Sequence, residues 1–192
     1  MAAANHFNAA FQPIASTEQG LLVETVIASA GRMAGTMLFR SVNFPVNSYA
    51  PGVTVLSEQA RDMGTKLMEL MFATLGHLGH AADVTTINQD AFSTKASHFT
   101  LQKTQEQFDP IVLSYCSAKH LTFEDAAFSL AMTSAILIHD CRWLLGVQSG
   151  ASIALHGFIE GLKTAPIAMA TPTGQVSVVS VESKKPWYKL WS

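Results

Sequence analysis

Apolar residues recur at helical spacing along most of the chain, and this pattern predicts an all-α protein. From residue 17 to residue 41, Val23, Ile27, Ala34 and Leu38 fall on one face of a helix. A second long helix is expected from about residue 54 or 57 to residue 82. Its apolar stripe consists of Met63, Leu67, Leu70 and Thr74.

The stretch from Thr122 to about Gly146 is apolar on every side, so it is expected to form the central helix. Asp125 follows Thr122 at the spacing of a helix capping pair, which predicts the start of the helix. The uncharged run over residues 126–138 is shorter than the roughly 20 residues that a bilayer requires, and this favours a buried helix over a membrane span. The glycines after it are expected to break the chain before a further helix at residues 151–164.

Shorter helices are expected at residues 97–107 and from Asp109 to about Lys119, with Pro110 at the first helical position. Together these elements predict an antiparallel helical bundle of four long helices plus one or two short ones, with extended arms at both ends. The expected division of the chain is an N-terminal arm at 1–16, a helical bundle at 17–165 and a C-terminal arm at 166–192.

Both terminal segments carry aromatic residues that favour docking onto another surface. Phe7 and Phe11 lie in the N-terminal segment, and the chain ends in the basic, aromatic sequence KKPWYKLWS. Such an ending suits a pocket on a partner, a membrane interface or the protein's own bundle. Its candidate interaction residues are Trp187, Tyr188, Leu190 and Trp191.

Ala28, Gly31 and Gly35 line a groove of small residues on the helix expected at residues 17–41. Small residues let two helix backbones approach closely, so these three are candidates for contact with a second copy of the chain. The other explanation, which the spacing favours, is close packing against another helix of the same bundle.

Charged residues make up only 14% of the chain, against about 25% in a typical soluble domain. Burial in an oligomer or filament, or contact with lipid, explains such a deficit. The formal net charge of −2 gives no electrostatic case for nucleic-acid binding. Cys116 and Cys141 both fall in expected helices and are typical of reduced core thiols, and the N-terminus lacks the pattern of a signal peptide, so a cytoplasmic location is expected.

Histidines are the only candidates for chemistry, because the chain has no phosphate-binding loop, dinucleotide fingerprint or zinc-cysteine cluster. Imidazole and carboxylate groups on facing helices could bind a metal ion, or one histidine could ligate haem. The alternative is that each histidine is satisfied by a neighbouring carbonyl or carboxylate. The candidate metal ligands are His77, His80, His139, His156, Asp140 and Glu160.

The sequence therefore favours a non-enzymatic structural protein that packs into a homo-oligomer, or with other subunits, through apolar helix faces and its terminal arms. No cofactor is favoured. One alternative is a metal- or haem-binding helical bundle, which could be an enzyme. The other is a peripheral membrane protein anchored by its C-terminal segment.

Overall fold

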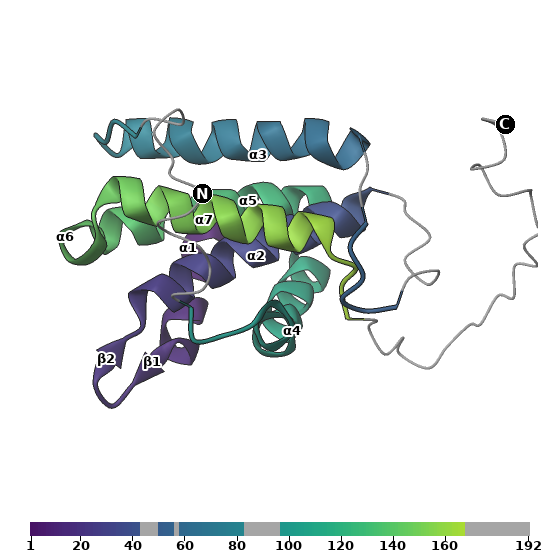
Figure 1. The fold of residues 1–192 in the computed structure, drawn as a ribbon, viewed down its shortest axis with the longest axis horizontal. Helices are drawn as coiled ribbons and strands as arrows, with labels where there is room; N and C mark the ends of the chain where they lie inside the picture. The colour runs from purple at the N-terminus through teal and green to yellow at the C-terminus, as the bar shows by residue number, and fades with distance from the viewer. Residues whose placement is uncertain (43–49, 56–57, 83–96, 168–192) are drawn as a thin grey trace, which may run out of the picture.

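The computed structural model describes residues 1–42, 50–55, 58–82 and 97–167, and within them the prediction of an all-α fold is confirmed. The described residues form seven helices and one short antiparallel hairpin (Figure 1). The elements are α1 Ala2–Ile14, β1 Ser16–Thr17, β2 Gly20–Leu21, α2 Val23–Ser41, α3 Glu58–His77, α4 Leu101–Lys119, α5 Phe123–Asp140, α6 Arg142–Leu145 and α7 Val147–Lys163.

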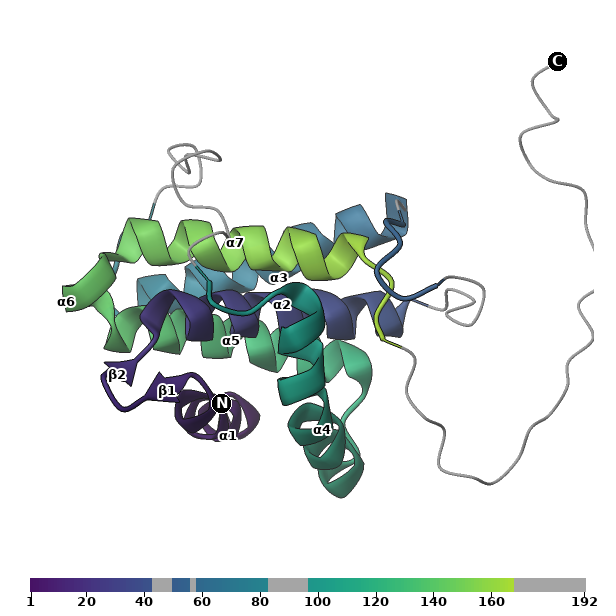
Figure 2. The same cartoon turned by 60° about the horizontal axis from the view of Figure 1, so that its bottom comes forward.

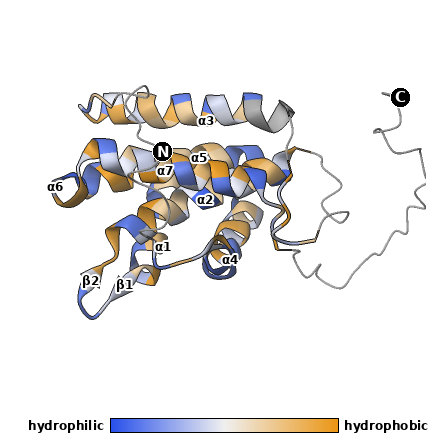
Figure 3. Ribbon diagram, viewed as in Figure 1, coloured by the Kyte–Doolittle hydropathy of each residue, from blue (hydrophilic) through white to orange (hydrophobic). Residues whose placement is uncertain are grey.

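The helices lie in three layers, with α2, α5 and α7 in the middle (Figures 1 and 2). On one side, α3 packs mainly on α5 through Leu67, Met71 and Leu75, and Figure 3 shows hydrophobic and hydrophilic residues alternating along this half-buried helix. On the opposite side lie α1 and α4. The central helix is α2, in which almost every side chain from Val23 to Phe39 is buried. The expectation that residues 122–146 form the central helix is therefore right only in part, because α5 lies in the middle layer but α2 is buried more completely.

Glycines explain why α2, rather than the more apolar α5, is the centre. Gly31 and Gly35 of α2 lie against the backbone of α7, and Gly157 and Gly161 of α7 lie against the backbone of α2. A Cβ atom added at any of these positions would come closer than 3.0 Å to a backbone atom of the other helix. The two helices can therefore approach more closely than helices with larger contact residues.

The N-terminal segment is a docked helix, so the prediction of an extended arm at residues 1–16 is wrong. Phe7 and Phe11 are one helical turn apart in α1 and are fully buried. The ring of Phe11 lies 4.3 Å from that of Phe108, measured between centroids. The alanine-rich sequence favours a helix, and the two aromatic side chains attach it to the core. The hairpin at residues 16–21 follows, so α2 begins at Val23, later than expected.

A single helix, α4, replaces the two short helices expected on either side of Asp109. Thr100 caps it by accepting a hydrogen bond from the Lys103 amide at 3.1 Å, and Pro110 lies inside it. Because Pro110 is on the exposed side, water can satisfy the carbonyl that its missing N–H leaves free.

The capping pair at the start of α5 is confirmed. The side chains of Thr122 and Asp125 each accept a hydrogen bond from the other residue's backbone amide, at 3.0 and 3.2 Å. The helix ends at Asp140, six residues earlier than Gly146, and the short helix α6 follows. Gly146 links α6 to α7, and its φ of 79° is a left-handed conformation that favours glycine.

Candidate functional site

Of the predicted metal ligands, the structure brings together His80 and His139. Nε2 of His80 lies 2.7 Å from Nδ1 of His139, and the ring centroids are 5.0 Å apart. One nitrogen must donate a proton and the other must accept it. Both side chains are half-buried at the contact between α3 and α5.

The other predicted ligands lie apart from this pair or have partners of their own. His77 is exposed at the end of α3, and His156 is half-buried on α7. Asp140 accepts a hydrogen bond of 3.3 Å from the Asn8 side chain, and Glu160 is paired with an arginine described below. Within residues 1–42, 50–55, 58–82 and 97–167, no three histidine, cysteine or acidic side chains are arranged to hold a metal ion.

Local backbone geometry fixes both members of the histidine pair. Gly79, with a φ of 85°, ends the turn after α3, and the His80 amide then donates to the Leu75 carbonyl at 3.0 Å. This cap directs the chain toward α5. His139 lies in the last turn of α5, where its carbonyl accepts a hydrogen bond of 2.6 Å from the Arg142 side chain.

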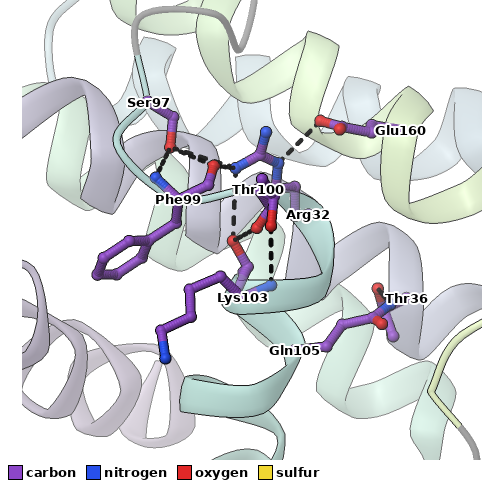
Figure 4. A network of polar contacts seen from close by, with 9 residues as sticks. Arg32, Thr36, Ser97, Phe99, Thr100, Lys103, Gln105 and Glu160 are labelled. Carbon is purple, nitrogen blue, oxygen red and sulfur yellow. Dashed lines mark hydrogen bonds and ion pairs between the residues drawn. The ribbon is translucent and has the colours of Figure 1, made fainter. Parts of the chain in front are cut away.

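A buried arginine network, which was not predicted, joins α2 to α4 and α7 (Figure 4). Arg32 is 2% exposed, and its Nε donates to Glu160 at 2.8 Å. Its Nη1 donates to the Phe99 carbonyl at 2.6 Å and to the hydroxyls of Ser97 and Thr104 at 3.2 and 3.4 Å. A buried guanidinium is costly without such partners, so this network fixes the segment before α4 against α2.

The polar contacts continue along α2 at intervals of one helical turn. Gln105 donates to the hydroxyl of Thr36 at 3.2 Å. Arg40 donates two hydrogen bonds, of 2.8 and 2.7 Å, to the carboxylate of Asp109. Ile167, beyond α7, donates its amide to Gln105 at 3.2 Å. These partners already engage the polar groups, so the arrangement sets the register of α2 and α4 rather than presenting an open site.

The candidate interaction residues have different surroundings. Ala28, Gly31 and Gly35 are buried, and the groove that they form is filled by α7 of the same chain. Trp187, Tyr188, Leu190 and Trp191, like most of the predicted C-terminal arm at 166–192, lie outside the described residues.

Two large apolar side chains that the sequence placed in a central helix are exposed instead. Trp143 is 84% exposed and Leu144 is 79% exposed, and they are neighbours in α6. The guanidinium carbon of Arg142 lies 4.9 Å from the centre of the Trp143 ring. We call these three residues the α6 corner. They are exposed because α5 ends early and the chain reverses over the four residues of α6.

Neither cysteine has the surroundings of an activated nucleophile. Burial raises the pKa of both thiols, and the negative charge of the neighbouring Asp140 raises the pKa of Cys141 further. A nucleophilic cysteine requires the opposite shift.

No protein-family model, curated protein or solved structure matches the chain. Within the part of the chain that the structure describes, no helix has both the length and the apolar character needed to cross a membrane.

Proposed function

We propose that the protein is a non-enzymatic, self-associating helical protein in which the α6 corner binds a second copy of the chain. The observation that carries this proposal is the exposure of Trp143 and Leu144, at 84% and 79%. Tryptophan and arginine are enriched among the residues that dominate binding energy at protein interfaces. The α6 corner places a tryptophan, stacked with Arg142, beside a leucine at one end of the protein.

The charges of the chain favour a protein partner over a lipid surface. Attachment to anionic lipid draws on several basic residues beside the apolar ones. The only charged residue of the α6 corner is Arg142. The exposed residue Asp140 precedes it by two positions, and the whole chain has a net charge of −2. Charged residues make up only 14% of the chain, so fewer charged side chains than usual are available to face water. This deficit is consistent with burial of one face of the protein in an assembly.

We further propose that the occupant of the α6 corner is the C-terminal segment, residues 168–192, of a neighbouring copy. This segment holds the aromatic residues predicted to bind a partner, Trp187, Tyr188 and Trp191. It follows Ile167, beyond the far end of α7, and α7 itself is about 25 Å long. The site of origin of the segment and the α6 corner therefore lie at opposite ends of the long helices (Figure 1).

The proposed pairing of the C-terminal segment with the α6 corner determines the symmetry of the assembly. An interface between the C-terminal segment of one copy and the α6 corner of another uses two different surfaces, so it joins copies head to tail in a ring of two or more copies or in an open filament. Antiparallel packing of the long helices, in this proposal, supplies the rigid body that carries the α6 corner at one end and Ile167, where the segment begins, at the other.

Replacing Trp143 and Leu144 together by alanine is expected to reduce the assembly to monomers. Because both side chains are exposed, folding should be unaffected and only the intermolecular contact should be lost. Native mass spectrometry and light scattering after size-exclusion chromatography measure the change. We expect the dissociation constant to rise at least tenfold, as about 1.4 kcal/mol of lost contact would produce.

Ile159→Ala is the matched control, since Ile159 is also an exposed apolar residue, at 39%, but lies on α7 away from the corner. It should leave the mass unchanged. A wild-type monomer, or a double variant of wild-type mass, contradicts the proposal. Vesicle flotation that depends on Trp143 and Leu144 would replace it with binding to a membrane surface.

A further inference from the structure

We propose that His80 and His139 together bind one divalent transition-metal ion and thereby clamp α3 onto α5. The two facing nitrogens are 2.7 Å apart although the residues are 59 positions apart in the chain. Imidazole nitrogen is a good ligand for copper, nickel and zinc ions. This inference does not depend on self-association.

Metal binding would require the two imidazole rings to move apart slightly and to turn. Metal–nitrogen bonds of about 2.0–2.1 Å place two imidazole nitrogens about 2.9 Å apart at a right angle and about 3.3 Å apart at a tetrahedral angle. From 2.7 Å, the facing nitrogens need to separate by a few tenths of an ångström, and both rings need to turn so that their lone pairs converge on the ion rather than on each other. In the neutral pair, the proton between the rings moves to the outer nitrogen of the same imidazole, and both facing lone pairs then become available to the metal.

The immediate surroundings define the kind of ion. No third histidine, cysteine or acidic ligand completes a cluster in the described ranges, so water fills the remaining positions. Two imidazoles with water suit Cu²⁺ best and Ni²⁺ or Zn²⁺ less well, following the general order of affinities. The Arg142 side chain contacts the carbonyl of His139 at 2.6 Å, and its positive charge opposes tight binding.

The position of the pair links metal binding to stability. The helix α3 packs mainly on α5, and the pair joins His80, just beyond the C-terminal end of α3, to His139 in the last turn of α5. The ion would be held by His80 after α3 and by His139 in α5, and these two side chains meet only in the folded protein. Binding should therefore favour the folded state and raise the melting temperature.

The test is a titration of tag-free, full-length protein with CuCl₂ or NiCl₂. Calorimetry measures the affinity and the number of ions bound, and thermal denaturation measures the shift in melting temperature. Wild-type protein should bind one ion per chain. His80→Gln and His139→Gln should each weaken binding at least tenfold, whereas His77→Gln and His156→Gln should change it less than twofold. His77 is the close control, because it is exposed only three residues before His80.

The proposal is overturned if wild-type protein does not bind Cu²⁺ at 100-fold excess. It is also overturned if His80→Gln or His139→Gln binds Cu²⁺ with the affinity of the wild type. Electron paramagnetic resonance of Cu²⁺ on the unmodified protein keeps the test valid if either variant fails to fold. Signals from two imidazole nitrogens are expected, and one or none would contradict the site.

Discussion

Gly161→Ala is expected to lower the free energy of unfolding by about 3 kcal/mol, the upper end of the usual cost of overpacking a core. A Cβ atom at Gly161 would come closer than 3.0 Å to the carbonyl oxygen of Arg32 and to the amide nitrogen of Thr36. Both obstacles are backbone atoms, so no side chain can rotate away. The whole contact between α2 and α7 would have to open.

Gly76→Ala makes the same chemical change without the obstacle. Gly76 lies in α3, is exposed, and an added Cβ atom would meet nothing within 4 Å. Because alanine favours helices, this variant should keep or gain stability, by up to about 1 kcal/mol. Urea denaturation followed by circular dichroism measures both values. Equal effects of the two substitutions would show that α2 and α7 do not pack as described.

Asp109→Ala is expected to cost about 3–5 kcal/mol, the usual result of removing one partner from a buried ion pair. Arg40 has a side chain only 5% exposed, and it donates both of its short hydrogen bonds to Asp109. Without the carboxylate, the guanidinium stays buried with its charge uncompensated. Thermal and urea denaturation measure the loss.

Two further variants isolate the cause. Glu160→Ala should cost less, because Glu160 is 34% exposed and Arg32 keeps its hydrogen bonds to Phe99, Ser97 and Thr104. Combining Asp109→Leu with Arg40→Met removes both charges and should recover much of the stability. If Asp109→Ala alone were harmless, the contact between α2 and α4 could not depend on this pair.

Local sequence signals predicted the helical class and some helix ends. Which helix is central depends on how the helices pack, and local signals do not show this. The capping pair at Thr122 could be predicted because both partners are three residues apart. The centre was misplaced because overall apolarity points to residues 122–146, whereas the closest packing uses Gly31 and Gly35. The helix α4 passes through Pro110 because the residue is exposed, which spacing alone does not reveal.

The candidate sites show the same division between local and long-range information. Histidine content identified His80 and His139, but their meeting depends on how α3 lies on α5. The network on α2 did leave a signal, since Arg32, Thr36 and Arg40 are spaced by one helical turn in an apolar helix. Charged residues in such a helix need buried partners, and this could have been used to search for them.

The central claim, head-to-tail association through the α6 corner, is tested most directly by mixing two variants. One carries Trp143→Ala and Leu144→Ala, and the other ends at Ile167, which keeps its hydrogen bond to Gln105. Each alone should be monomeric in native mass spectrometry, and an equimolar mixture should form a heterodimer and nothing larger, because one intact interface remains. A truncated protein that assembles like wild type, or a mixture that stays monomeric, would contradict the account.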